Sequence, residues 1–469
     1  MSNDNRNKMG VMPEGRLLIS MSLPMMISML VQALYNIVDS IFVSRIGADL
    51  GPIIQDGDKL ITQGEAALTA VSLAFPLQSL MIAIGAGTGV GVNALVSRAL
   101  GAKDQKEANA TAENGIFVFV LSYIFTAIVG LLAVKPFYSF MTSPEQTEIY
   151  EYGVQYLTIA MTLSFGIYMQ FIFERLLQST GRTFFTMLSQ ATGAIINLIL
   201  DPILIFGYFG LPEMGVKGAA LATIIGQIIA GFAAFFFNKK KNNDLQLSFK
   251  GFRPNKAIIK NIYKIGVPSI VMQSIGSVMT TGMNTILMDL SSTSAAVFGI
   301  YFKLQSFFFM PVFGLNNGLI PIISFNYGAR NRKRMITTLK YGFMIALGLL
   351  LVGFIAFEFF PEFLFSFFDA SADMLEIGIP ALRIIGTHFL IAWFCIVAGS
   401  MFQAIGKASY SLYVSVARQL LVLLPAAYIL AKLGGLAAIW WCFPIAELMS
   451  LLISVICMVR SFRHDLAGF

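Results

Sequence analysis

Long apolar runs recur along the whole chain, and short polar stretches separate them. Each run exceeds the ~20 residues that a helix needs to cross the hydrocarbon core of a bilayer. The runs do not alternate over segments of ~10 residues, as the strands of a membrane β-barrel would. The pattern therefore predicts an all-α polytopic membrane protein with twelve transmembrane helices, at 17–45, 66–97, 110–134, 153–178, 184–208, 214–237, 259–288, 294–326, 336–360, 376–402, 408–431 and 436–459.

The composition agrees with this prediction. Of the 469 residues, 57% are apolar and 12% are charged, whereas a soluble domain carries roughly 25% charged residues. The mean hydropathy is +0.75. We therefore expect no large soluble domain and no nucleic-acid partner. We expect the first helix to be retained, because its apolar run is too long for the core of a signal peptide.

Residues that would support enzyme chemistry are scarce. The three cysteines lie in apolar runs, where free thiols behave as small hydrophobic groups, so no disulfide or metal site is predicted. Of the two histidines, His388 lies within a span and His464 lies in the tail. We expect that the protein is not an enzyme and binds no cofactor.

The distribution of lysine and arginine indicates the orientation, because these residues favour cytoplasmic loops. With both termini in the cytoplasm, the opposite side holds only five of the 32 basic residues, namely Arg45, Lys59, Lys135, Lys217 and Lys432. Acidic residues favour that outer side, including those of the loop 47–65, for which we have no functional interpretation. The longest basic connection, around 239–258, is interpreted as a cytoplasmic linker; a contact with lipid headgroups is the alternative interpretation of its charge.

The two halves of the chain resemble each other. Leu77-Gln78-Ser79 and Leu304-Gln305-Ser306 are separated by the same spacing as Gly87 and Gly314, Gly91 and Gly318, and Gly101 and Gly328. Six spans in each half preserve the orientation of the repeat, so the two copies should be related by a pseudo-two-fold axis along the membrane normal. The predicted units are an amino-terminal lobe (1–238), the linker (239–258) and a carboxyl-terminal lobe (259–469). Transporters of this design bind substrate between the lobes.

Two carboxylates lie inside predicted spans. Asp39 is in the first span and Asp201 is in the fifth, both in the half nearer the outer side. A charge at that depth costs a few kcal/mol, so such residues are rare and usually functional. Tyr35 and Asn197 precede them by four residues, which puts each pair on one helix face. With Thr223 of the sixth span, the five side chains can meet at one depth.

This set of oxygen atoms suits a proton, Na⁺ or a lipophilic cationic substrate. Two carboxylates in a low-dielectric pocket do not both ionise without cost, so a proton or a cation between them is expected. We predict that the five residues form a coupling site in which Asp39, Asn197 and Asp201 bind Na⁺ or H⁺, and that Asp39 also contacts the substrate. The repeat positions in the second half carry Val422 and Ala426, so the ion site is expected in one lobe only.

The other charged residues within spans, and the prolines that can bend a helix, have simpler interpretations. The charged residues predicted to be buried in the second half are Lys303, Arg383, Arg418 and Glu447. A structural pair between Arg418 and Glu447 is favoured over a functional one. Pro24 and Pro202 are candidate hinges of the first and fifth spans, although static helices also carry such bends.

Several motifs together resemble the multidrug and toxic compound extrusion (MATE) transporters, particularly their DinF-like branch. The resemblance covers nearly the whole chain and rests on five motifs: Tyr35 to Asp39, Leu73-Ala-Phe-Pro76 with the following glycines, Gln178 through Asn197-Leu-Ile-Leu-Asp201-Pro202, Gly215-Val-Lys-Gly218-Ala-Ala-Leu-Ala-Thr223, and Phe443-Pro444-Ile-Ala-Glu447.

The resemblance implies a V-shaped fold of two six-helix lobes. It also implies efflux of amphipathic or cationic compounds by alternating access, in exchange for H⁺ or Na⁺, and a bend of the first helix around Pro24. It carries the cation site over to Asp39, Asn197, Asp201, Thr223 and Tyr35. Gln273 and Asn284 stand in the seventh span, where some branches have acids, and this difference favours the DinF-like branch. A monomer in a bacterial cytoplasmic membrane, in contact with its lipids, is expected.

Two other functions compete with this one. A related flippase for lipid or lipid-linked oligosaccharide would need a row of buried Arg and Lys along its cavity to handle a pyrophosphate, and the intramembrane basic residues here are few. A membrane-embedded enzyme such as an acyltransferase would need a positioned base, and no motif surrounds His388.

Overall fold

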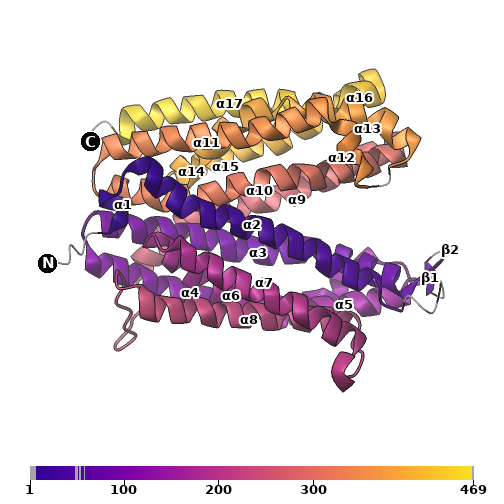
Figure 1. The fold of residues 1–469 in the computed structure, drawn as a ribbon, viewed down its shortest axis with the longest axis horizontal. Helices are drawn as coiled ribbons and strands as arrows, with labels where there is room; N and C mark the ends of the chain where they lie inside the picture. Colours follow the sequence, from indigo (N-terminus) through magenta and orange to yellow (C-terminus); the bar gives the residue numbers. More distant parts are fainter. Residues whose placement is uncertain (1–6, 48–50, 52–53, 57–58, 369, 467–469) are drawn as a thin grey trace.

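The protein is a bundle of long helices, which a computed structural model describes for residues 7–47, 51, 54–56, 59–368 and 370–466 (Figure 1). The helices of the first half are α1 (Lys8–Val11), α2 (Glu14–Ser44), α3 (Gln63–Gly101), α4 (Gln105–Met141), α5 (Thr147–Thr162), α6 (Phe165–Ser179), α7 (Thr183–Phe206), η2 (Tyr208–Gly210) and α8 (Val216–Lys241). Those of the second half are α9 (Lys256–Leu290), α10 (Ser292–Gly328), α11 (Arg332–Phe359), α12 (Pro361–Ser366), α13 (Ala372–Gly386), α14 (Phe389–Ala404), α15 (Ala408–Val416), η3 (Ala417–Leu423), α16 (Leu424–Ile439), α17 (Cys442–Arg460) and η4 (Ser461–Asp465).

The two ends of the bundle differ. Both ends of the described chain lie at one end, which we call the terminal end, and a small hairpin lies at the other, the hairpin end (Figure 1). The hairpin pairs β1 (Ile54–Asp56) with β2 (Lys59–Ile61) in antiparallel register. It occupies the acidic loop predicted at 47–65, of which 48–50, 52–53 and 57–58 lie outside the described residues. Glu65 and Thr62 then form a capping box that starts α3.

Among the described residues, nine helices are long and apolar enough to cross a membrane, and eleven if each of two bent pairs counts as one span. α9, of 35 residues, takes the place of the remaining predicted span. The predicted continuous helices at 153–178 and 376–402 are wrong in one respect, because each is broken. α5 and α6 meet at 43°, and α13 and α14 meet at 50°.

A hydroxyl group bonds the local backbone at each of the two breaks. Ser164 Oγ donates to Met161 O (2.7 Å), and Thr387 Oγ1 donates to Ile384 O (2.7 Å). Hydroxyl groups that bond the local backbone compete with the helical ladder. A second irregularity is the π-helical turn η3, which interrupts the span formed by α15 and α16. Such turns are rare and frequently lie at functional sites.

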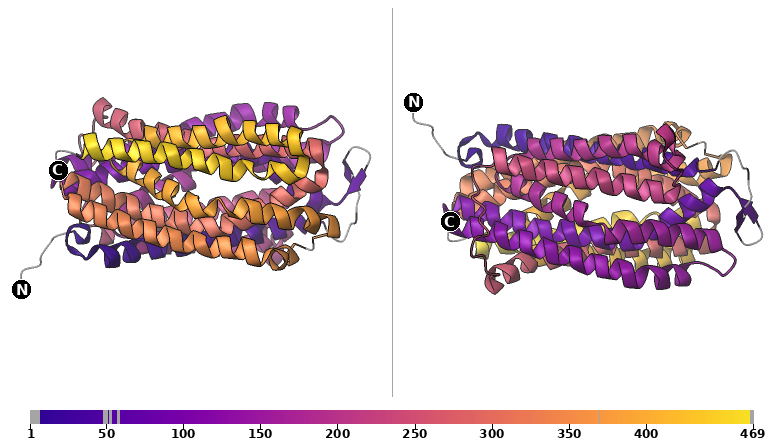
Figure 2. Two further views of the ribbon diagram at one scale, coloured as in Figure 1. Left: turned by 90° about the horizontal axis from the view of Figure 1, so that it is seen from above. Right: turned by 90° about the horizontal axis from the view of Figure 1, so that it is seen from below.

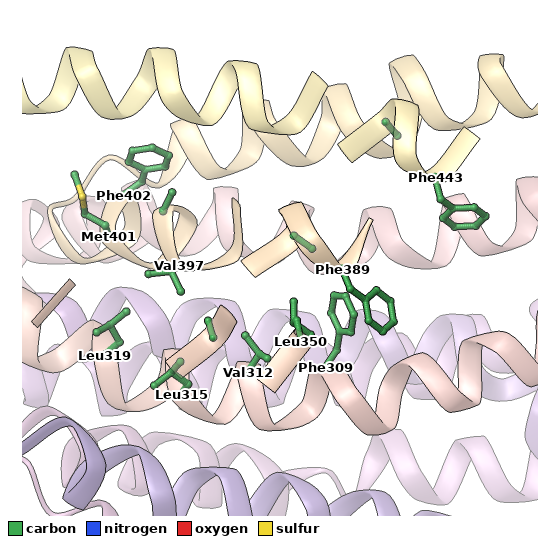
Figure 3. Close-up of a cluster of buried hydrophobic side chains, with 14 of the residues drawn as sticks. Phe309, Val312, Leu315, Leu319, Leu350, Phe389, Val397, Met401, Phe402 and Phe443 are labelled. Carbon is green, nitrogen blue, oxygen red and sulfur yellow. The ribbon is translucent and has the colours of Figure 1, made fainter. Parts of the chain in front are cut away.

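The helices form two lobes, which differ in colour in Figures 1 and 2. We call α2–α8 the amino-terminal lobe and α9–η4 the carboxyl-terminal lobe. The carboxyl-terminal lobe has a continuous apolar core, part of which Figure 3 shows around Phe309, Leu315 and Phe389. The amino-terminal lobe has a second core, to which Tyr138 and Leu177 belong.

α2 belongs to both cores. Leu17, Leu18 and Met21, near its start, pack in the carboxyl-terminal core, whereas Val43, near its end, packs in the amino-terminal core. Pro24 lies between these two parts and is accommodated within the helix. The first part of α2 is therefore anchored in one lobe and the last part in the other.

The lobes touch through pairs of equivalent glycines. A Cβ on Gly101 would stand 1.9 Å from Phe325 O, and a Cβ on Gly328 would stand 2.0 Å from Arg98 O. Gly87 faces Ile270 and Gly314 faces Met26 in the same reciprocal manner. Only glycine allows backbones to approach so closely. These contacts place repeat-equivalent residues opposite one another, as the predicted two-fold relationship requires.

Candidate functional site

The two predicted carboxylates meet. Asp39 lies five residues before the end of α2, and Asp201 lies five residues before the end of α7, so both are near the hairpin end. Their carboxyl groups are within hydrogen-bonding reach of each other. Two ionised carboxylates at this separation repel strongly in a low-dielectric setting. A proton or a cation is therefore needed for both groups to remain in place.

Asn197 and Thr223 complete the polar side of this site. Asn197 Nδ2 donates to Asp201 Oδ1 (3.2 Å), one turn along α7, and to Thr223 Oγ1 of α8 (3.3 Å). Tyr35, one turn before Asp39 on α2, is in electrostatic contact with both carboxylates. The structure thus brings all five predicted residues together.

Three oxygen atoms of the site are buried and have no hydrogen-bond partner among the described residues. They are Asp39 Oδ1, Asn197 Oδ1 and Asp201 Oδ2. Buried polar atoms are nearly always paired, so three such acceptors in one place need an explanation. A bound proton can satisfy one of them, and carboxylate and amide oxygens are also the ligand type that Na⁺ takes. The donor set fits either ion, as the sequence predicted.

Tyr156 also belongs to the site, although the sequence analysis did not identify it. Its side chain, on α5, is 6% exposed and lies within electrostatic range of Asp39, Asp201 and Tyr35. Its hydroxyl accepts a hydrogen bond from Gln78 Nε2 (3.2 Å) on α3. A tyrosine in a predicted span gives too weak a signal to find this residue from sequence.

A cavity extends from this site toward the terminal end. Its outline spans about 820 Å³, a figure that includes space open to solvent. Tyr35, Asn197 and Thr223 line one part of it. The rest is a mixture of amide, aromatic and thioether side chains, including Gln32, Gln170, Gln178, Gln190, Gln227, Asn317, Phe171, Met25 and Met29. Flexible methionines suit ligands of varied shape.

Glu174 places a third carboxylate in the wall of this cavity. It is 2% exposed, on α6. Gln170 Nε2 (2.9 Å), Ser189 Oγ (3.0 Å) and Gln190 Nε2 (2.6 Å) all donate to it. Gln190 in turn accepts a hydrogen bond from Ser28 of α2. The carboxylate is thereby linked to the helix that carries Asp39.

The neighbouring Arg175 bridges the lobes. Its Nη1 donates to Gln178 Oε1 (2.8 Å) and to Asn317 Oδ1 (3.0 Å), and Asn317 lies on α10 of the carboxyl-terminal lobe. Glu174 and Arg175 were not predicted as site residues, because they stand near the end of a predicted span. The signal was present, since the predicted span 153–178 includes both charges.

The carboxyl-terminal lobe holds no comparable site at the repeat positions, where Val422 and Ala426 stand. The predicted pair forms, with Arg418 Nη1 3.4 Å from Glu447 Oε2. The expectation that Lys303 and Arg383 are buried is wrong, because both lie on outward faces of their helices. Lys303 stands over the ring of Phe368, and Arg383 Nε donates to a backbone carbonyl.

Pro202 follows Asp201 directly and, like Pro24, lies inside a helix. Its missing N–H leaves a carbonyl one turn earlier without its usual partner. Pro202 therefore adjoins the site. Pro24 lies where α2 passes from the carboxyl-terminal core to the amino-terminal core.

Comparison with known proteins decides the family. The sequence profile of the MatE family matches residues 60–203 and 268–429. The chain belongs to the MATE transporter family. It is thus a multi-pass membrane transporter, and its two six-helix halves are the twelve-helix MATE fold. The family consists of transporters, in agreement with the expectation that the protein is not an enzyme.

Individual MATE relatives span nearly the whole chain. "Multidrug export protein MepA" of Staphylococcus haemolyticus (strain JCSC1435) is 27% identical over 445 residues, covering 95% of this chain and 93% of that protein. The protein of the same name from Staphylococcus aureus (strain MSSA476) is 26% identical over 437 residues, covering 93% of this chain and 91% of that protein.

Two solved structures have the same architecture. The structure described as "Outward-facing conformation of a multidrug resistance MATE family transporter of the MOP superfamily" matches with a TM-score of 0.88 at 25% identity, covering 99% of each chain. "Crystal structure of MATE in the bent conformation" matches with a TM-score of 0.84 at 25% identity, covering 97% of this chain and 96% of that chain.

Proposed function

We propose that this MATE-family protein is a multidrug efflux antiporter that exports amphipathic, cationic compounds in exchange for H⁺ or Na⁺. The observation that carries the proposal is the pair Asp39 and Asp201, whose free oxygens adjoin a cavity that also contains Glu174. Carboxylates attract a lipophilic cation and also bind the ion that replaces it. The staphylococcal relatives are named multidrug export proteins, which supports drug efflux as the function.

Competition for one site couples the two fluxes. Asp39 contacts the substrate cation, and a proton or Na⁺ that binds between Asp39, Asn197 and Asp201 neutralises the acids and lowers affinity for that cation. Ion entry then favours drug release on the outer side. The change at Asp39 is transmitted along α2, which can bend at Pro24 because its two parts are anchored in different lobes. Pro202 allows α7 to adjust with it.

In this proposal the two lobes, 1–238 and 259–469, rock as units joined by the linker 239–258. The terminal end faces the cytoplasm of a bacterial cell, and the hairpin end faces outward. Lys239, Lys240 and Lys241 at the terminal end support this orientation, because basic residues favour the cytoplasmic side. The protein acts as a monomer, since each chain contains both lobes and a complete ion site.

Efflux of a fluorescent lipophilic cation from proteoliposomes tests the proposal. Na⁺ and pH gradients are imposed separately, on the wild-type protein and on Asp39→Asn. We expect one gradient to drive transport and the variant to lose it. Absence of gradient-driven transport for several such cations would contradict the antiporter and favour a lipid-flipping function.

A further inference from the structure

The short helix α1 lies across the terminal end and contacts both lobes (Figure 1). It precedes α2, whose first part is already embedded in the carboxyl-terminal core. The coupling site lies at the opposite end of α2, so α1 takes no part in ion or substrate binding. Its contacts with the two lobes differ in kind.

On the carboxyl-terminal side, α1 is held by charge-assisted bonds and by burial. Arg334 of α11 donates from Nη2 to Met12 O (2.6 Å) and Met9 O (3.3 Å), and its Nη1 lies 3.5 Å from Glu14 Oε1. Asn326 Nδ2 of α10 also donates to Met9 O (3.4 Å). The Met9 side chain is fully buried in the carboxyl-terminal core. Bonds from an ionised donor are roughly twice as strong as neutral ones.

On the amino-terminal side, the two described hydrogen bonds both come from the neutral donor Asn7, and one of them is accepted by a carboxylate that Arg182 already pairs. Asn7 Nδ2 donates to Thr180 O (3.1 Å), in the turn between α6 and α7, and to Asp244 Oδ1 (3.2 Å) in the linker. Asp244 also pairs with Arg182 (2.9 Å). Lys8 is half-buried beside Arg182, and its partial burial, followed by this like charge, lowers the pKa of Lys8 below its ordinary value. The like charges weaken this side of the contact.

The linker moves with the amino-terminal lobe, because α4 holds its backbone. Gln246 N donates to Asn109 Oδ1 (3.0 Å), Ser248 N donates to Glu113 Oε1 (2.8 Å), and Asn255 N donates to Asn114 Oδ1 (2.8 Å). These bonds run along more than one turn of α4. Asp244 is therefore a fixed point of the amino-terminal lobe rather than part of a loose tether.

We infer that α1, together with its flanking residues Asn7 and Met12, is a strap that holds the two lobes together at the terminal end. When the lobes part there, the strap leaves the amino-terminal lobe at Asn7 and stays on the carboxyl-terminal lobe through Arg334. The amino-terminal side is released because α1 makes its stronger contacts with the carboxyl-terminal lobe. In addition, α1 leads directly into the part of α2 whose residues Leu17, Leu18 and Met21 lie in the carboxyl-terminal core. The inference rests on the proposed function only in taking the two lobes to move apart.

Distances between spin labels test which side is released. Cysteines are introduced in pairs at three exposed positions, Val11, Lys106 of α4 and Lys333 of α11. The native cysteines are replaced by alanine, and the protein is reconstituted in lipid nanodiscs. The Lys106–Lys333 pair reports separation of the lobes as pH and Na⁺ are varied. We expect the Val11–Lys106 distance to lengthen with it while the Val11–Lys333 distance stays constant. Lengthening of Val11–Lys333 instead would overturn the inference.

Asn7→Ala supplies an independent test, with Val11→Ala as the matched control on the same helix. Leu95, which packs against both cores, is replaced by cysteine and labelled from the terminal side with a membrane-impermeant thiol reagent. Asn7→Ala should raise the labelling rate of the Leu95 position about two- to tenfold, which corresponds to the loss of one or two modest hydrogen bonds. It should also lengthen the Val11–Lys106 distance. Val11→Ala should leave the rate unchanged.

A wild-type labelling rate in Asn7→Ala, with an unchanged Val11–Lys106 distance, would show that α1 is no strap, even if no ion condition separates the lobes. Neither readout requires a drug. Failure of the strap is therefore distinguishable from failure of the multidrug antiporter, which is measured as gradient-driven efflux.

Discussion

Asp39 and Asp201 share one site but differ in their surroundings. Asp201 is fully buried and held by Asn197, whereas Asp39 is partly exposed and keeps one oxygen without a partner among the described residues. Removing the charge of Asp39 therefore leaves no new buried charge unpaired, since Asp201 retains its amide donor. A change at Asp39 should affect ion binding more than folding.

Asp39→Asn should abolish gradient-driven efflux and leave the yield of inserted protein near that of the wild type. The amide preserves volume but cannot take up a proton at neutral pH or supply charge to Na⁺. Efflux per amount of folded protein in proteoliposomes measures the effect. Glu447→Gln is the control; loss of its pair with Arg418 should lower the yield of folded protein without changing efflux per molecule. Wild-type efflux from Asp39→Asn would refute the assigned role.

Glu174→Gln should weaken transport of cationic compounds selectively. The new amide N–H would face the donors of Gln190 and Gln170, a mismatch that costs about 1–3 kcal/mol, and the cavity would lose a charge. The expected result is a KM at least several-fold higher for a lipophilic cation, with little change for a neutral amphipathic compound. Ser189→Ala, which removes one donor and keeps the carboxylate, should change KM less. Equal effects on both compounds would argue for a purely structural carboxylate.

Residue spacing predicted that the polar residues near Asp39 and Asp201 lie together, but it did not predict the whole cavity. Asp39, Asp201, Asn197 and Thr223 were found because their positions along the spans fix their depth, and four-residue spacing fixes their face. Glu174 was not predicted because it stands near the end of a predicted span, and its place in the cavity also depends on the break between α5 and α6. Lys303 and Arg383 were misplaced because a charge within a span does not reveal which face it occupies.

At the scale of elements, the crossing of α3 and α10 leaves no room for a side chain at Gly101 or at Gly328. The Cβ positions of Gly101 and Gly328 collide with backbone carbonyls, and backbone cannot move aside as a flexible side chain can. The break between α13 and α14 and the turn η3 also escaped sequence analysis. The apolar pattern fixes which segments are helical, while such irregularities depend on single hydrogen bonds.

Gly101→Ala should destabilise the protein by at least the 1–3 kcal/mol typical of overpacking. The expected observation is a lower midpoint of thermal unfolding in detergent. Gly348→Ala in α11 is the matched control, because a Cβ there meets nothing within 4 Å. That substitution should be neutral or stabilise by about 0.5–1 kcal/mol, since alanine favours the helix. Similar midpoints for both variants would contradict the close contact.

At the scale of the whole molecule, the proposed orientation rests on where the basic residues gather relative to the two ends. Cysteines introduced at Val11, at the terminal end, and at Phe209, which is 90% exposed near the hairpin end, report on opposite sides. In intact cells, a membrane-impermeant thiol reagent should label Phe209→Cys and leave Val11→Cys unlabelled until the cells are opened. The reverse pattern would invert the proposed topology and the direction of transport.

The reciprocal glycine contacts also bear on how the two halves of the chain arose. Gly101 meets the Phe325 carbonyl as Gly328 meets the Arg98 carbonyl, so one contact is built twice from equivalent residues. In an ancestor made of two identical six-helix subunits, one codon would have specified both copies, and one mutation would have removed both. In a single chain each copy has its own codon, so Arg98 and Phe325 can differ, and one half can carry acids that the other lacks.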